Sequence, residues 1–328
     1  ERRDFDQLLA VVANERALDP ILIEKDYWIM HSLWGLQAQG FVFELKGGTS
    51  LSKGFGVIHR FSEDIDIRIE PPADMDVKTG RNQDKPAHID SRRAYYDALS
   101  KRIRIPGIDS VERDTFFDDE KMRSAGIRLV YSSRAATVAG LKDGILLELG
   151  FDDTAPNRPV TISSWALDFA MSRGVEVVDN RAADVPCYAP THTFVEKLQT
   201  ISTKYRRLAE VQKFPGNFLR HYYDVYCLLA LPEVQAFMQE QAYQDRKVQR
   251  FRSGDELVIA KNHLLDGDIK MVDLRSVFNL SSSCCNLVLS DSSCRMMDCN
   301  SSLACSSANK RFESLASASV SSVDCFFS

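Results

Sequence analysis

Long apolar runs are missing from this 328-residue chain, because Glu, Lys, Arg or Asp recur throughout. A bilayer-spanning helix needs about 20 predominantly apolar residues, so the sequence predicts no membrane partner. A secretory signal is also missing, since the opening residues ERRDFDQLLAVVANE have an amphipathic helical pattern without an apolar core or a cleavage site. We therefore expect a cytoplasmic protein.

Cysteine is scarce before residue 281, where only Cys187 and Cys227 occur. The other cysteines fall in the serine-rich residues 281–328, and their spacing does not match a pair of zinc knuckles. We interpret 281–328 as a Ser- and Cys-rich tail that is non-native or disordered, rather than as a metal-binding segment.

Basic residues are concentrated late in the chain, although the formal net charge is −5. Lys and Arg outnumber Asp and Glu between residues 197 and 252. Such an excess suits nucleic acid, but it is equally typical of a solvated helix surface.

Hydrophobic periodicity divides the chain into a mixed half and a helical half. We predict helices at 4–16, 20–39, 49–57 and 91–104, strands at 41–45, 65–69, 126–132, 144–151 and 175–178, and then helices at 193–207, 217–231 and 233–243. The expected fold class is α/β (α+β), with a mixed-sheet core over 1–188 and an α-helical C-terminal lobe over 189–280.

The most informative segment is GGTSLSKGFGVIHRFSEDID at residues 47–66. Gly47 and Gly48 permit close approach of backbone N–H groups to phosphate, and Thr49 and Ser50 extend this turn. No GK[ST] follows at Walker A spacing, so the turn is not a P-loop. Taken alone, it is also compatible with a plain strand–helix connection.

Two carboxylates follow this turn at alternate positions of a strand pattern. Asp64 and Asp66 are expected on one face of the strand, where both can reach one hard cation such as Mg²⁺ or Mn²⁺. A third ligand could come from Glu148, within the apolar run ILLEL, or Glu148 could simply face water. Lys53 lies one helical turn after the glycines and could reach a phosphate. This combination suits metal-dependent nucleotidyl transfer from an NTP.

These residues resemble the AbiEii/AbiGii family of nucleotidyltransferase toxins from type IV-like toxin–antitoxin and phage-defence systems. The matching segments are 23–28 (IEKDYW), 45–53 (LKGGTSLSK), 60–66 (RFSEDID), 194–198 (FVEKL) and 220–226 (RHYYDVY). The last segment departs from the family pattern Arg-Asp-x-Tyr-Asp, and the chain ceases to resemble the family after about residue 273.

The resemblance implies a DNA-polymerase-β-like nucleotidyltransferase core and a helical C-terminal lobe. It implies that Asp64 and Asp66 bind metal, that Gly48 and Ser50 hold phosphate, and that Lys53 and Lys197 contact the triphosphate. Asp224 would be a further essential acid. Ser62 would be a regulatory position that a cognate antitoxin kinase phosphorylates in some relatives, where the added charge would oppose NTP entry.

The resemblance also implies an acceptor, which in related mycobacterial toxins is the 3′ end of tRNA. The basic residues of the helical half would then hold RNA phosphates, and its tyrosines would stack on a terminal base. These residues are Lys204, Arg206, Arg207, Lys213, Arg220, Tyr205, Tyr222 and Tyr223. The alternatives are an enzyme that modifies a protein hydroxyl or a small molecule, and a domain that binds nucleotide or antitoxin without turnover.

Overall fold

The computed structural model describes residues 2–135, 142–211 and 218–257. The chain divides into two compact units, of which the first ends at Ala189 and the second begins at Pro190. The sequence prediction placed this boundary near residue 188. None of the helices in the described part of the chain has the length and hydropathy that a bilayer-spanning segment needs.

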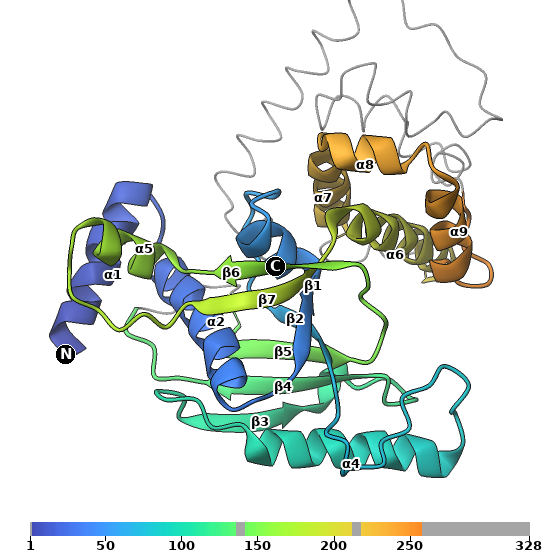
Figure 1. The fold of residues 1–328 in the computed structure, drawn as a ribbon, viewed down its shortest axis with the longest axis horizontal. Helices are drawn as coiled ribbons and strands as arrows, with labels where there is room; N and C mark the ends of the chain where they lie inside the picture. Colours follow the sequence, from blue (N-terminus) through green and yellow to red (C-terminus); the bar gives the residue numbers. More distant parts are fainter. Residues whose placement is uncertain (1, 136–141, 212–217, 258–328) are drawn as a thin grey trace, which may run out of the picture. The chain divides into compact units, whose positions relative to one another are not determined.

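A mixed, seven-stranded sheet forms the centre of unit 1 (Figure 1). Its strands are β1 (Phe43–Lys46), β2 (Ile65–Ile69), β3 (Ser110–Asp114), β4 (Ser124–Val130), β5 (Ile145–Gly150), β6 (Asn157–Ile162) and β7 (Ala182–Tyr188). They lie in the order β3-β4-β5-β2-β1-β7-β6. The pairs β1–β7 and β2–β5 are parallel, and the others are antiparallel.

Strand alternation separates an apolar face of this sheet from a polar one. On β2, Ile65, Ile67 and Ile69 are buried in the main core, whereas Asp66 and Arg68 point to the opposite face. On β1, Phe43 and Leu45 are buried in the same core and alternate with the half-buried Glu44 and Lys46. One face of the sheet therefore holds the core, and the other is available for charged side chains.

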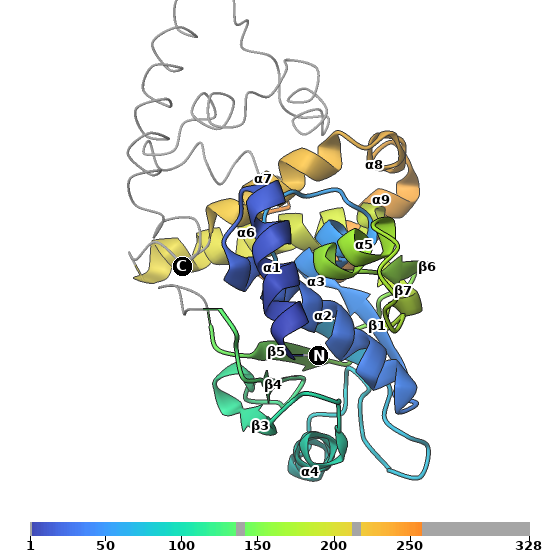
Figure 2. The ribbon, with the colours of Figure 1, turned by 90° about the vertical axis from the view of Figure 1, so that its left-hand side faces the viewer.

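Helices α2 (Pro20–Ala38) and α4 (Pro86–Arg102) supply side chains to this core. Figure 1 shows α4 running along the β3 edge of the sheet. Helices α1 (Arg2–Arg16) and α5 (Trp165–Ser172) contact α2 and each other around a smaller core, as Figure 2 shows from the side. Asp19 caps α2 by accepting a hydrogen bond from the Ile21 N–H, with Pro20 at the first helical position.

A short helical stretch joins β1 to the loop before β2. It consists of α3 (Gly47–Thr49) and the π-helical turn η1 (Ser50–Gly54). The predicted Gly-Gly turn is thus the first turn of a helix that begins directly at the end of β1. Thr115–Phe117 forms a 3₁₀ turn, η2, between β3 and β4.

Unit 2 is helical over its described residues. It contains α6 (Pro190–Val211), α7 (Leu219–Leu229), α8 (Pro232–Phe237) and α9 (Gln241–Arg250). Phe194, Leu198, Leu228, Val234 and Tyr243 are among its buried side chains. The predicted tail at 281–328 lies outside the described residues.

Several elements differ from the sequence prediction. The predicted strand at 175–178 is wrong, because these residues have no regular secondary structure and the strand lies at β7 instead. Helix α4 begins at Pro86, before the predicted start of this helix at residue 91. Strands β3 and β6 and helix α5 were not predicted.

Candidate active site

The polar face of the sheet brings three carboxylates into one region. Asp64 precedes β2, Asp66 lies on β2, and Glu148 lies directly opposite Asp66 on the neighbouring parallel strand β5. All three side chains are half-buried. The register therefore places Glu148 beside the aspartates, and it does not lie on an edge strand.

Burial and like charge raise the pKa values of Asp64 and Glu148. Burial raises the pKa of Asp64, and the neighbouring carboxylates of Glu63 and Asp66 add to this effect, whereas Lys142 opposes it. Burial, followed by the charges of Asp66 and Asp64, raises the pKa of Glu148 to about 8. A hydrogen bond with the Asp66 side chain raises the pKa of Glu148 further, whereas the charge of Lys142 lowers it.

The donor chemistry of this group fits a hard divalent cation. Oxygen ligands from carboxylates are those that Mg²⁺ prefers, and Mg²⁺ in nucleotide sites is held by one or two carboxylates together with waters and substrate phosphates. Among the described residues, no set of three or more His, Cys, Asp or Glu side chains stands in metal-binding geometry. Asp64 and Asp66, with Glu148 beside them, remain the candidate metal ligands.

Gly47 lies directly under the carboxylate of Asp66. Its φ of +72° is in the left-handed region that favours glycine. A Cβ at this position would lie 1.9 Å from Asp66 Oδ2. The glycine-rich turn and the candidate metal ligand are therefore in van der Waals contact, and only a glycine permits this contact.

The remaining residues of the turn are anchored by the RFSED segment. The Thr49 hydroxyl donates to the Asp64 carbonyl and lies 3.1 Å from Ser62 Oγ. A Cβ on Gly48 would lie 2.6 Å from the same Ser62 oxygen. Thr49 and Ser50 are fully buried. The Thr49 hydroxyl stabilises the turn from inside, and Ser62 covers Gly48.

Lys53 is directed toward α2. Its ammonium forms an ion pair with Asp26, and it lies 5.6 Å from the ring centroid of Trp165. Asp26 also accepts a hydrogen bond from the backbone N–H of Trp165 at 2.8 Å. Burial raises the pKa of Asp26, while the charge and hydrogen bond of Lys53 lower it. The predicted contact of Lys53 with triphosphate stays a prediction, and its observed contact is structural.

The IEKDYW segment of α2 contains three consecutive charged residues that contact the segments around the site. Glu24, Lys25 and Asp26 are at most 2% exposed. Because neighbouring helix residues point about 100° apart, they reach different segments around the site. Glu24 accepts hydrogen bonds from the N–H groups of Arg134 and Ala135, and Lys25 pairs with Glu63 at 2.9 Å. Helix α2 thus ties together the loops that surround the carboxylates.

Lys142 is a site residue that the sequence did not reveal. Its ammonium lies 3.1 Å from Asp64 Oδ2. It follows a segment without a recognisable motif, and its sequence separation from Asp64 is 78 residues. The several carboxylates near Asp64 suggest that a cation lies close to them. No local sequence pattern identifies Lys142 as that cation.

Lys197 and Asp224 form an ion pair within unit 2, with Lys197 Nζ 2.8 Å from Asp224 Oδ2. The Asp224 side chain is fully buried and that of Lys197 is 12% exposed. This pair joins α6 to α7, which gives both residues a structural role. Their predicted catalytic roles stay predictions.

The basic residues of unit 2 are partly engaged within the unit. Lys204 Nζ lies 2.9 Å from His221 Nε2, and Arg206 pairs with Asp255. Tyr205 and Tyr222 are buried, so the expectation that they stack on a base is not met in this conformation, whereas Tyr223 is half-buried. Arg207 and Arg220 are exposed, and Lys213 lies outside the described residues.

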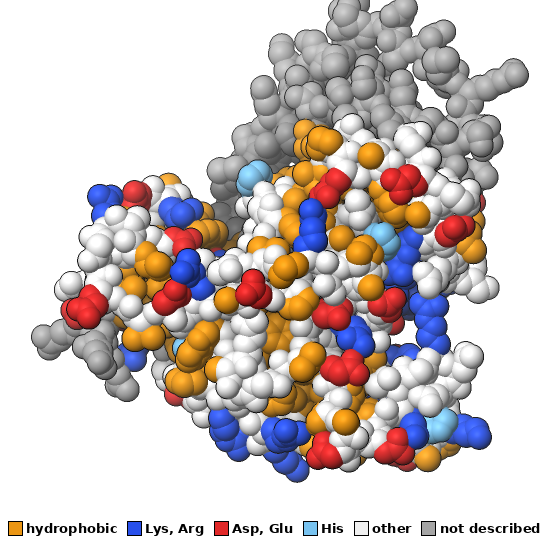
Figure 3. Space-filling view, in the orientation of Figure 1, with side chains coloured by type: hydrophobic (Ala, Val, Ile, Leu, Met, Phe, Trp, Pro, Cys, Tyr) orange, Lys and Arg blue, Asp and Glu red, His pale blue; other side chains and the backbone are white. Residues whose placement is uncertain are grey.

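On the face of unit 1 drawn in Figure 3, basic and acidic side chains are interspersed.

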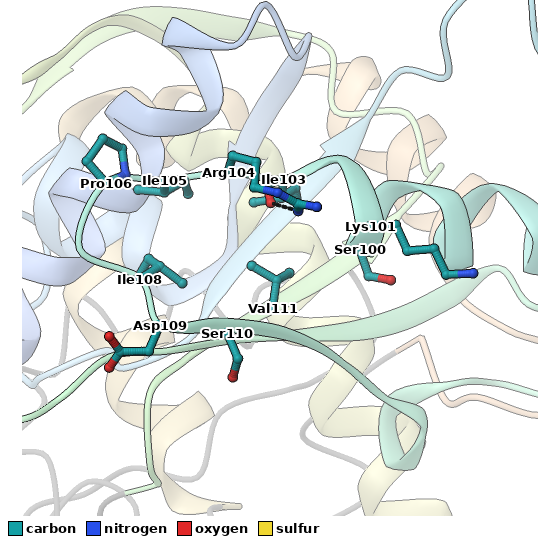
Figure 4. Close-up of a pocket in the computed structure, with 10 residues that line it drawn as sticks. All are labelled: Ser100, Lys101, Ile103, Arg104, Ile105, Pro106, Ile108, Asp109, Ser110 and Val111. Atoms are coloured by element: carbon teal, nitrogen blue, oxygen red, sulfur yellow. Dashed lines mark hydrogen bonds between the residues drawn. The ribbon is translucent and has the colours of Figure 1, made fainter.

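A separate pocket of about 640 Å³ lies between the end of α4 and the start of β3. Figure 4 shows Ile108 and Val111 pointing toward the segment that carries Ile103 and Ile105. Arg104 donates to the Ile103 carbonyl at 2.6 Å. The lining includes none of the candidate site residues, so the pocket is not part of the carboxylate site.

Comparison with known proteins identifies a related family. The model of the nucleotidyl transferase AbiEii toxin of type IV toxin–antitoxin systems matches residues 34–276. A solved structure, an antigenic nucleotidyltransferase-like protein from Paracoccidioides brasiliensis, is 13% identical over 69% of this chain and 87% of its own, with a TM-score of 0.34. No curated protein gives a significant match.

Proposed function

The chain belongs to the AbiEii nucleotidyltransferase toxin family of type IV toxin–antitoxin systems, and on this premise we propose that it transfers a nucleoside monophosphate from an NTP to RNA, at the 3′ end of tRNA. The observation that carries the proposal is the cluster of Asp64, Asp66 and Glu148 on the polar sheet face, in contact with Gly47. A tRNA that carries an added nucleotide at its 3′ end could not be aminoacylated, and translation would stop.

Asp64 and Asp66, assisted by Glu148, would hold Mg²⁺ or Mn²⁺, which neutralises charge on the triphosphate when bound. The backbone N–H groups of the turn that begins at Gly47 would hold phosphate oxygens. The RNA 3′-hydroxyl oxygen forms a bond to the α-phosphorus, the bond from this phosphorus to the bridging oxygen breaks, and pyrophosphate leaves. The hydroxyl proton passes to water. Positioning and charge neutralisation account for most of such catalysis.

RNA would be held by unit 2, where Arg207 and Arg220 are exposed. Lys197 and Asp224 of this unit are included in the proposal as a triphosphate contact and an essential acid, on the strength of the family resemblance. Because phosphate contacts release counter-ions, RNA binding should weaken steeply as salt concentration rises.

Regulation by the cognate antitoxin is proposed to act at Ser62. Its hydroxyl lies against Gly48 and Thr49 and is two residues from Asp64. A phosphate on this oxygen would occupy the space above the turn and add negative charge beside the carboxylates. Both effects oppose the entry of an NTP.

A transfer assay tests the proposal. The full chain is incubated with total tRNA, Mg²⁺ and each α-³²P-labelled NTP in turn, beside a D64A/D66A variant. We expect label on tRNA with the wild-type chain, no label with the double variant, and loss of transfer on adding a chelator. Label on protein in place of tRNA would contradict the proposed acceptor, and no label in any fraction would contradict the proposed activity.

Gly47→Ala should reduce this transfer about 100-fold, because the new Cβ displaces the Asp66 carboxylate by more than 1 Å and misplacement of this size costs about that much in rate. Gly40→Ala is the matched control. Gly40 has φ of +76°, close to that of Gly47, but nothing lies within 4 Å of its added Cβ. Both variants should lose about 1–3 kcal/mol of unfolding free energy from backbone strain. Equal transfer by the two variants would show that the contact with Asp66 is unimportant.

A further inference from the structure

Lys142 is fixed at its backbone by two charged residues from distant parts of the chain. Its carbonyl accepts a hydrogen bond from Lys25 Nζ, and its N–H donates to Glu63 Oε2 at 3.4 Å. Lys25 and Glu63 are themselves paired at 2.9 Å. Both backbone groups of one residue are therefore held by a single ion pair.

This ion pair is a firm anchor. The Lys25 side chain is 2% exposed and that of Glu63 is 17% exposed. Charges buried to this extent must stay paired and hydrogen-bonded, because leaving either without a partner is strongly unfavourable. The anchor therefore fixes where the Lys142 side chain begins.

The side chain of Lys142 remains accessible. It is 42% exposed, and its ammonium lies 3.1 Å from Asp64 Oδ2 and 5.3 Å from the ring centroid of Phe117. Lysine is a compact charge on a flexible stem, which suits it to binding phosphate without fixed directionality. A lysine with an anchored backbone and an accessible ammonium therefore lies at the edge of the candidate metal site.

The charge of the site indicates what this ammonium would do on substrate binding. Without a metal ion, it offsets part of the negative charge of Asp64. A divalent cation on Asp64 and Asp66 would replace it in this role. The ammonium could then turn to the anion that arrives with the cation, within the length of one lysine side chain.

We propose that Lys142 binds the triphosphate of the NTP and offsets the charge that develops on the departing pyrophosphate, with Lys25 and Glu63 as its positioning residues. This inference rests on the proposed function. Lys142 would act as the bond between the α-phosphorus and the bridging oxygen breaks, since charge then builds on the leaving group.

Inorganic tripolyphosphate with Mg²⁺ is a suitable probe, because it needs neither the correct base nor the acceptor. Isothermal titration calorimetry would compare the wild-type chain with K142M, K142R and the control K121M. Lys121 also forms an ion pair, with Asp84, and is exposed, so K121M makes the same charge change elsewhere on unit 1. We expect K142M to bind the probe about 10- to 100-fold more weakly, as for loss of a charged hydrogen bond. K142R should retain most of the affinity.

The affinity for Mg²⁺ in the absence of tripolyphosphate distinguishes two roles of Lys142, which are binding of the triphosphate and neutralisation of the Asp64 charge. K142M removes a competitor from Asp64, so its Mg²⁺ affinity should be unchanged or higher. Higher Mg²⁺ affinity with unchanged tripolyphosphate affinity would overturn the role of Lys142 and leave the proposed function in place. Failure of the wild-type chain to bind Mg²⁺ with tripolyphosphate would overturn the nucleotide site itself, and this inference with it.

A double-substitution cycle tests the positioning role. Glu63→Gln preserves the shape of the side chain but removes the charge that pairs with Lys25, so it should weaken tripolyphosphate binding in the same direction as K142M. If Glu63 acts through the ammonium, E63Q/K142M should bind no more weakly than K142M, because interacting residues are not additive. Additive losses would contradict the positioning role.

Discussion

Replacing Asp66 with asparagine is expected to reduce nucleotide transfer by about 1,000-fold or more. A catalytic metal ion contributes several kcal/mol of charge stabilisation, and each 1.36 kcal/mol is a factor of ten in rate. Asp66 lies on β2 between Gly47 and Glu148, so it links the phosphate turn to the third carboxylate. Its removal should therefore disturb both parts of the site.

The same substitution should not destabilise unit 1. Asp66 is close to Glu148, whose pKa of about 8 reflects burial and the charges of Asp66 and Asp64. Removing one of these charges relieves repulsion, so we expect the melting temperature of D66N to equal or exceed that of the wild type. An activity loss without a stability loss distinguishes a functional carboxylate from a structural one.

Glu70→Gln provides the matched control for D66N. Glu70 follows the end of β2, is half exposed and pairs with Arg68 at 2.6 Å. The substitution removes one negative charge from the same strand region but leaves the carboxylate cluster intact. We expect E70Q to retain transfer at every Mg²⁺ concentration, whereas added Mg²⁺ should restore D66N only in part. Wild-type transfer by D66N would exclude Asp66 from the metal site.

Local signals predicted the elements that carry the carboxylates. The strand at 65–69 was predicted with the bounds that β2 has, because three isoleucines alternate with charged residues and charged loops flank them. Helix α2 begins at the predicted Pro20, since Asp19 and Pro20 together form a strong start signal. The spacing of Asp64 and Asp66 predicted that the two carboxylates lie near each other, and their charges do interact, whereas metal binding by them stays a prediction.

Pairing between distant segments could not be predicted in this way. The sequence left open whether Glu148 faces water or the aspartates, and the β2–β5 register decides this. Strand β7 was missed because Pro186 argues against a paired strand. The false strand at 175–178 has apolar residues but no partner, and Val178 is 82% exposed.

Contacts of high sequence separation also determine the surroundings of the site. Lys25 reaches the carbonyl of Lys142 across 117 residues, so neither the anchor nor its effect on Asp64 has a local signature. Lys53 has the spacing of a phosphate ligand from Gly48, yet Asp26 of α2 holds its ammonium. The family motifs include both Lys53 and Asp26, but they do not indicate that these two side chains pair with each other.

Asp26→Ala is expected to have the largest effect on stability. It would leave the Lys53 ammonium, which is 11% exposed, without its partner, and the Trp165 N–H without its acceptor. Breaking a buried ion pair by removing one member costs about 3–5 kcal/mol. For a chain of this size, about 1 kcal/mol corresponds to a shift of about 2–4 °C, so the melting temperature should fall by about 6–20 °C in thermal unfolding followed by circular dichroism.

Two further variants show that the buried charge, and not the loss of packing, causes this effect. Asp179→Ala breaks the exposed pair with Arg181 and should leave the melting temperature nearly unchanged, because exposed ion pairs contribute little to stability. D26A/K53M should be more stable than D26A, because no unpaired ammonium remains buried in the double variant. If D26A were no less stable than the Asp179 variant, the ion pair would not hold α2 against the phosphate turn. Lys53 would then be available to the substrate, as its position in the motif predicts.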